Sequence, residues 1–115
     1  IYLENQSSPE DNHYLWAYHV RIENLGHEVV QLKTRHWVIT DAYGRRQEIR
    51  GVGVVGENPT IMPGENFEYT SGTPLTTPSG IMVGEYEMEK LDGETFIVDV
   101  PAFSLDSPYQ PFLLN

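Results

Sequence analysis

The sequence predicts an all-β protein, an antiparallel sandwich of about seven to eight short strands. Three observations support this fold class: apolar and polar residues alternate, turn residues recur about every ten positions, and no stretch keeps a helical period. An OB-type barrel is the alternative arrangement for so many short strands. At 115 residues the chain is expected to form a single domain, residues 1–115.

The first half of the chain contains the clearest strand signals. Residues 13–25 alternate, and the face expected to enter the core carries Tyr14, Trp16, Tyr18, Val20 and Ile22. A turn at residues 24–27 leads into a second long strand, residues 29–40. A hairpin loop follows at residues 41–44, where Gly44 suits a positive φ, and a shorter strand is predicted over residues 45–50.

The second half alternates strands with proline- and glycine-rich turns. A strand is predicted over residues 66–70 and a loop over residues 73–80. Residues 81–90 and 94–100 form a predicted hairpin, closed by residues 91–93. An edge strand at Tyr2 and Leu3 and an extended tail from Pro101, with Phe103 and Leu105 apolar, complete the expectation.

The spacing around Tyr86 favours an immunoglobulin-like or fibronectin type III-like sandwich. Met88 follows Tyr86 by two residues, which is the layout of a tyrosine corner with methionine in the place of the second cysteine. Trp37 is the expected buried tryptophan of such a fold. The chain has no cysteine, so we expect a sulfur–aromatic contact in place of a disulfide.

Charge is distributed unevenly along the chain. The net charge of −10 argues against nucleic-acid binding and against attraction to anionic membranes. Residues 33–56 hold five of the seven cationic residues and two acidic ones, so this segment carries +3 and the remainder −13. No apolar run approaches the ~20 residues of a membrane span, so no membrane insertion is expected. The lack of cysteine fits a reducing, cytoplasmic location.

The run of residues 51–56 has the G-x-G-x-x-G spacing of dinucleotide-binding loops, with Gly51, Gly53 and Gly56 at the glycine positions. Its context argues against a nucleotide enzyme. The preceding residues 45–50 are too charged for the central strand of a parallel sheet. Pro63 would break a following helix, and no acidic residue lies about 20 positions on. We expect a glycine-rich crossing loop of a β-sandwich.

The same loop suggests an alternative, the binding of a small anion such as pyrophosphate or a nucleotide. Backbone N–H groups of a glycine loop can form an anion-binding nest, and arginines can clamp phosphate. Alternation places Arg46 and Arg50 on one strand face and Arg45 on the other, so only the first two are candidates beside Gly51, Gly53 and Gly56. A charged edge strand is the simpler explanation for these arginines.

Beyond these patterns, the chain resembles the ApaG family over nearly its whole length. The resemblance rests on residues 2–7, 35–41, 51–56, 63–65, 67–72, 77–80 and 96–101 with Phe103; the apolar tail at residues 109–114 contributes nothing to it. It implies a fibronectin type III-like or immunoglobulin-like sandwich, and a bacterial protein linked to cobalt resistance and magnesium efflux. The family has no established enzyme activity and no agreed catalytic residues; related domains are supposed to act in protein–protein contact.

Neither a metal centre nor a catalytic site has a convincing pattern. The four histidines are scattered, and the weak metal candidates are Glu85, Glu87 and Glu89, which alternate onto one strand face and would suit a hard cation such as Mg²⁺. A solvated outer face explains the same carboxylates. Ser71 and Ser79 have no base placed near them by sequence, so we expect no enzyme activity and no cofactor.

An interaction module with an unidentified protein partner is the leading functional prediction for such a sandwich. Tyr43 at the tip of the predicted hairpin is the aromatic expected in solvent, and with Arg45 and Arg46 it forms the predicted contact surface. A homodimer formed through exposed strand edges is the further alternative, although lysine and arginine on an edge argue against strand pairing.

Overall fold

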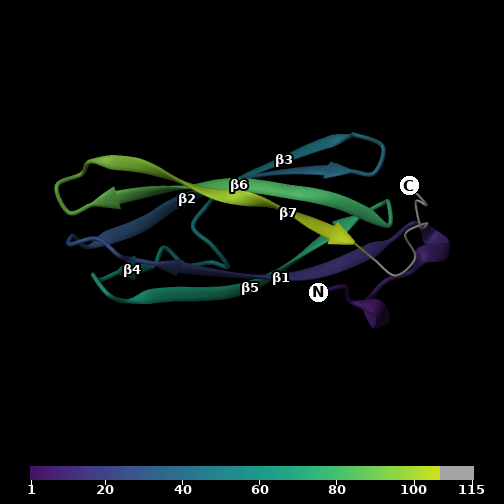
Figure 1. The fold of residues 1–115 in the computed structure, drawn as a ribbon, viewed down its shortest axis with the longest axis horizontal. Helices are drawn as coiled ribbons and strands as arrows, with labels where there is room; N and C mark the ends of the chain where they lie inside the picture. The colour runs from purple at the N-terminus through teal and green to yellow at the C-terminus, as the bar shows by residue number, and fades with distance from the viewer. Residues whose placement is uncertain (107–115) are drawn as a thin grey trace.

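The computed structural model describes residues 1–106, and these residues are arranged almost entirely in β-strands (Figure 1). The predicted apolar tail at residues 109–114 lies outside the described residues. Two single 3-10 turns, Glu4–Gln6 and Pro9–Asp11, are the helices in this part of the chain, and neither could span a membrane. The strands are β1 (Tyr14–Glu23), β2 (Val30–Asp41), β3 (Arg46–Val52), β4 (Thr60–Ile61), β5 (Asn66–Leu75), β6 (Ser79–Lys90) and β7 (Thr95–Asp106).

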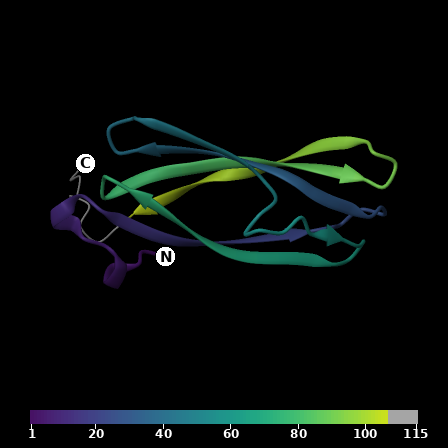
Figure 2. The same cartoon turned by 180° about the vertical axis from the view of Figure 1, so that it is seen from behind.

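The strands form two antiparallel sheets that lie one above the other (Figure 1; Figure 2). The smaller sheet pairs β1 with β5. The larger sheet has the order β3-β2-β6-β7, and the short strand β4 pairs with the end of β2. Both sheets are open, so the sandwich prediction is confirmed and the barrel alternative is wrong.

The core lies between the sheets and is rich in aromatic side chains. Trp16 of β1 and Trp37 of β2 are each 2% exposed, and Trp37 packs edge-on against Tyr18, Tyr86 and Phe103. Gly84 makes this packing possible, because a Cβ there would lie 2.4 Å from Cε3 of Trp37. The expected burial of Tyr14, Trp16 and Trp37 is confirmed.

The tyrosine-corner prediction is wrong in its details. Tyr86 lies in the middle of β6 and not at a corner, and its hydroxyl bonds to the hydroxyl of Tyr69 across the two sheets. Burial raises the pKa of both hydroxyls, so both remain protonated at neutral pH. The rings that contact Trp37 are Tyr18, Tyr86 and Phe103. Met88 is buried in the same core, and its sulfur–aromatic contact stays a prediction.

Two strands run further than predicted, and each contains a proline that the sequence pattern assigned to a loop or tail. β5 continues through Pro74, and β7 continues through Pro101 to Asp106. Pro74 pairs with Leu15, and the N–H of Leu15 donates to the hydroxyl of Ser7, away from β5. The two residues therefore exchange no backbone hydrogen bond, and the N–H that proline lacks would have pointed to the free edge of β5. Pro101 lies where the β6–β7 register shifts between Met82 and Gly84, and β7 is an edge strand.

Candidate functional site

The β2–β3 hairpin presents an exposed tyrosine on a tightly bonded loop. Tyr43 is 78% exposed, as predicted, and the guanidinium of Arg45 lies 5.2 Å from the centre of its ring. Asp41 organises the loop: its Oδ1 accepts the N–H groups of Tyr43 and Arg45, both at 2.9 Å, and its Oδ2 accepts Nε of Arg45 at 2.7 Å. An arginine beside a ring in this way is a cation–π pair, which holds both side chains in one arrangement.

The electrostatics of this loop favour the ionised form of Asp41. Burial of the carboxyl works against its charge, but the hydrogen bonds from Arg45 and Tyr43 outweigh that effect and lower the pKa of Asp41. A neighbouring loop adds support. Thr77 is 2% exposed, and its hydroxyl accepts the N–H of Ala42 at 3.1 Å and donates to the carbonyl of Ser79 at 2.8 Å. Sequence reasoning missed Thr77, because its residue range was assigned to an irregular loop.

The three residues of the predicted contact surface are close together but not equivalent. Arg45 precedes β3 and is bonded to Asp41, whereas Arg46 begins β3 opposite Thr40. Arg46 and Arg50 share the outward face of β3, as alternation predicts, and Ile49 between them packs against the core. Arg46 and Arg45 line a surface hollow of about 300 Å³ together with Asp41.

The glycine run has a structural explanation. Gly51 lies in β3, and a Cβ there would meet the guanidinium of Arg35 at 2.6 Å. Gly53 has a φ of 67°, and a Cβ would lie 2.2 Å from the carbonyl oxygen of Glu57. Val55 and Gly56 both have positive φ between Val54 and Glu57, whose backbones exchange two hydrogen bonds of 2.8 Å, as in a tight type I′ turn.

The five residues of the predicted anion site are divided between different places. The N–H groups of Gly53 and Val54 already donate to the carbonyls of Lys33 and Glu57. Arg50 and Gly51 line a hollow of about 450 Å³ that also contains Glu85 and Glu87, and the lining does not include Gly53, Gly56 or Arg46. The chain after Gly56 enters β4 and not a helix, so the setting differs from that of a dinucleotide-binding loop. Anion binding stays a prediction.

The weak metal candidates lie along one strand and do not converge on a common point. Glu85, Glu87 and Glu89 occupy alternate positions on the outward face of β6. Within residues 1–105, no three His, Cys, Asp or Glu side chains come close enough to hold a metal ion. A divalent-metal site at these carboxylates stays a prediction.

One cluster on this face was missed by sequence reasoning. His36 lies between two carboxylates on the outward face of the larger sheet. Its Nδ1 is 3.2 Å from Glu85 of β6, and its Nε2 is 3.6 Å from Glu48 of β3. The three residues come from three strands, so only the pairing of β2 with both neighbours could have brought them together. Alternation alone places His36 opposite the Trp37 face, but it does not identify its partners.

The comparisons with known proteins identify the family. The ApaG domain family matches residues 4–90 of the chain. The chain belongs to the ApaG family. It is 65% identical to Protein ApaG of Paramagnetospirillum magneticum over 100% of this chain and 88% of that protein. It is 67% identical to Protein ApaG of Rhodospirillum centenum over 94% of this chain and 83% of that protein.

A solved structure of this family has the same fold. The crystal structure described as the putative ApaA protein from Bordetella pertussis superposes with a TM-score of 0.89 at 48% identity, covering 95% of this chain and 89% of that one. The resemblance seen in the sequence is therefore confirmed for the family and for the two-sheet β-sandwich, and the immunoglobulin-like or fibronectin type III-like class stays a prediction. The ApaG family match includes the hairpin and the glycine run within residues 4–90.

Proposed function

We propose that this chain is a non-enzymatic protein–protein interaction module that acts in the cytoplasm through the β2–β3 hairpin. The observation that carries the proposal is Tyr43, an aromatic side chain 78% exposed at the tip of a hairpin whose loop is fixed by Asp41. The cobalt resistance and magnesium efflux linked to the ApaG family would then depend on a protein contact made by this surface.

Physical chemistry supports this choice of surface. Tyrosine and arginine are enriched among the residues that contribute most to binding energy at interfaces. A side chain that is already ordered loses less conformational entropy on binding. Asp41 holds the loop backbone at Tyr43 and the side chain of Arg45, and the guanidinium of Arg45 contacts the Tyr43 ring. The hairpin extends from one end of the larger sheet, as Figure 1 shows, where a partner can approach it from several sides.

The non-enzymatic part of the proposal has separate support. Among residues 1–106, no histidine or carboxylate side chain hydrogen-bonds to the hydroxyl of Ser71 or Ser79, the serines considered as nucleophiles. A serine nucleophile needs an adjacent base. The buried ionisable pair, Tyr69 and Tyr86, is enclosed between the sheets, where a substrate could not reach it.

The test is a quantitative affinity pull-down from cell extract with the wild type and with the triple variant Tyr43→Ala, Arg45→Ala, Arg46→Ala. We expect at least one protein captured by the wild type to be lost with the triple variant. Leu91→Ala is the matched control, because Leu91 is 85% exposed at the β6–β7 turn, at the other end of the larger sheet. A triple variant that captures the same proteins as the wild type contradicts the proposal.

A further inference from the structure

The outward face of the larger sheet exposes apolar side chains that the smaller sheet does not. Of the ten large apolar residues exposed among residues 1–106, none lies on β1 or β5. Four lie on the outward face of the larger sheet: Val52 (74% exposed), Ile97 (54%), Ile81 (53%) and Val83 (38%). Ile81 and Val83 are neighbours on β6, whereas Val52 and Ile97 lie at opposite edges with Thr34 and Glu87 between them, so this face mixes apolar and polar positions.

The strand register arranges this outward face in rows. The side chains of each row project from neighbouring positions on β3, β2, β6 and β7. One row contains Arg50, His36, Glu85 and Asp99. The next row contains Val52, Thr34, Glu87 and Ile97. A third, nearer the hairpin, contains Arg46, Thr40, Ile81 and Ser104.

Charge is distributed asymmetrically across these rows. Arg46 and Arg50 lie on β3, at one edge, with Glu48 between them, whereas Asp99 lies on β7 at the other edge. Asp99 and Glu87 make no ion pair with any residue in the range 1–106. Arg50 is 71% exposed, and its ion pair, to Glu48, is long at 3.8 Å.

We propose that this face is a self-association surface, on which a second copy of the chain packs face to face. The two-fold axis would run nearly parallel to the strands, between β2 and β6. This operation places β3 of one copy over β7 of the other and keeps each row over the same row. Arg50 then opposes Asp99 of the second copy, and Val52 opposes Ile97. This surface is separate from the hairpin tip, and the inference goes beyond the function proposed above.

The two-sided charge pattern is the reason to choose a second copy as the occupant. A symmetric dimer interface must be self-complementary, since the same patch contacts itself. Under the proposed two-fold axis, His36 opposes Glu85 and Val38 opposes Val83, so none of these positions sets like charge against like charge. A partner of uniformly basic surface would match Asp99 and Glu87 but would be repelled by Arg46 and Arg50.

The size of the face predicts a weak dimer. Four strands spaced about 4.8 Å apart give a contact only about 15–20 Å wide, which belongs with the smaller protein interfaces. Sheet twist also restricts close packing to the central rows, with the strands of the two copies crossing at about 30°. We therefore expect a dissociation constant on the order of 100 μM.

The test is sedimentation equilibrium of the full chain from about 10 μM to about 1 mM, at low and at high salt. The wild type should show a reversible monomer–dimer equilibrium. Arg50→Glu and Asp99→Arg, tested singly, should each weaken it about tenfold or more, because each creates two like-charge contacts in the dimer. An equimolar mixture of the two variants should regain association near the wild-type level, since the mixed dimer restores both opposite-charge contacts.

Matched controls come from the other outer face. Arg21→Glu and Glu68→Arg make equal changes of charge on the smaller sheet and should leave the association constant unchanged. Three outcomes overturn the proposal: a wild type that stays monomeric at 1 mM, single variants that associate as the wild type does, or a mixture that associates no better than its components. The mixture separates a specific face-to-face contact from a general effect of net charge.

Discussion

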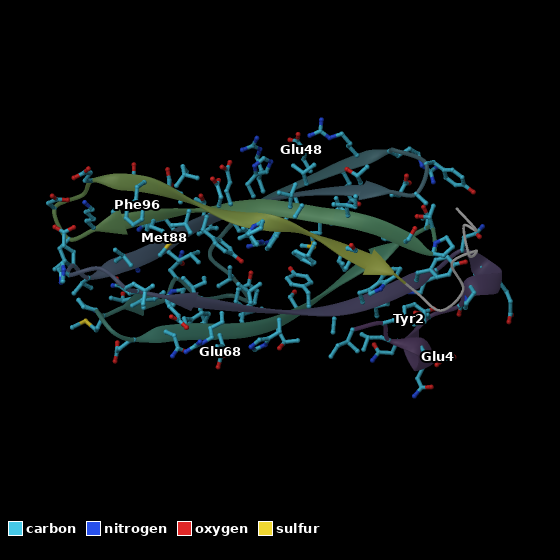
Figure 3. The ribbon with its side chains drawn as sticks, viewed as in Figure 1. Tyr2, Glu4, Glu48, Glu68, Met88 and Phe96 are labelled. Carbon is cyan, nitrogen blue, oxygen red and sulfur yellow. The ribbon has the colours of Figure 1, made fainter. Side chains whose placement is uncertain are left out.

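The two outer faces of the sandwich differ in how their charged side chains are paired. On the smaller sheet, Glu68 lies 3.2 Å from His19 and 3.9 Å from Arg21, and Arg21 also pairs with Glu23, so the charges are matched locally. On the larger sheet, Asp99 and Glu87 have no such ion pair among residues 1–106. Figure 3 shows Glu68 and Glu48 pointing away from the core on opposite sides of the molecule.

The difference predicts separate roles for the outer and the inner faces. Both sheets contribute to one aromatic core, and the Tyr69–Tyr86 hydroxyl pair joins them. On the smaller sheet's outer face, each charged side chain has an ion-pair partner. The larger sheet's outer face has exposed apolar residues and carboxylates without an ion pair. Substitutions at inward positions on both sheets should therefore change stability. Self-association should respond only to substitutions at outward positions on the larger sheet.

The largest expected effect comes from a glycine on the inner side of the larger sheet. Gly84→Ala would place Cβ 2.4 Å from the Trp37 ring and 2.7 Å from the carbonyl oxygen of His36, so the free energy of unfolding should fall by about 2–3 kcal/mol. Gly72→Ala on the smaller sheet is the matched control, because its Cβ comes no closer than 3.4 Å to Trp16 O and should change stability by less than about 0.5 kcal/mol. Urea unfolding followed by circular dichroism measures both, and equal losses would contradict this account of Trp37 packing.

The hydroxyl pair between the sheets should give the next effect. Tyr69→Phe or Tyr86→Phe leaves the remaining buried hydroxyl without its partner, so each single variant should lose about 1–2 kcal/mol. The double variant should lose no more than either single variant, since it leaves no unpaired hydroxyl. A double-mutant cycle from urea unfolding measures this coupling, and simple additivity of the two losses would show that the pair contributes nothing jointly.

The same pair predicts a pH dependence. Burial raises the pKa of Tyr86 to about 12 and raises that of Tyr69 further, whereas an unfolded tyrosine ionises near 10.0. The folded state therefore binds more protons than the unfolded state in alkali, so the stabilisation is complete below pH 10 and is lost as pH rises above it. The wild type should lose stability above pH 10 more steeply than the Tyr69→Phe, Tyr86→Phe double variant. Parallel pH profiles would contradict this.

The smallest effect should come from the charges on the two outer faces. Arg21→Ala removes part of the matched network on the smaller sheet and should lower stability by about 0.5 kcal/mol, with the loss shrinking at high salt. Glu87→Gln removes an unmatched charge from an acidic protein and should leave stability at or slightly above the wild-type value. Thermal unfolding at two salt concentrations compares them, and a larger loss for Glu87→Gln would reverse the contrast between the faces.

The sequence predicted the strands whose inner faces alternate and failed where context overrides the local pattern. Alternation located β1 and its core residues because Trp16 and its neighbours follow a period of two without interruption. The short strand β4 gave no signal, since two residues are too few for a period. Pro74 and Pro101 stopped the predicted strands too early, because a sequence alone does not reveal which strand lies at an edge.

The candidate surfaces, like the strands, could be predicted from the sequence only in part. Exposure of Tyr43 follows from its place in a four-residue hairpin loop, so the sequence could identify it. The bonds that fix the loop backbone come partly from Thr77, which accepts the N–H of Ala42 but lies far away in sequence and has no local signature. The opposition of Arg50 and Asp99 at the two edges of one sheet depends on strand order, which no local pattern contains.

The placement of the two tryptophans has an optical consequence. Trp16 and Trp37 lie on the inner faces of different sheets, each 2% exposed, so the fluorescence of each reports on a different layer of the sandwich. Separation of either sheet would expose an indole to water and shift its emission to the red. Contact at the hairpin tip or on an outer face would leave both indoles in the same apolar surroundings. Intrinsic fluorescence thus distinguishes loosening of the fold from docking, without any added label.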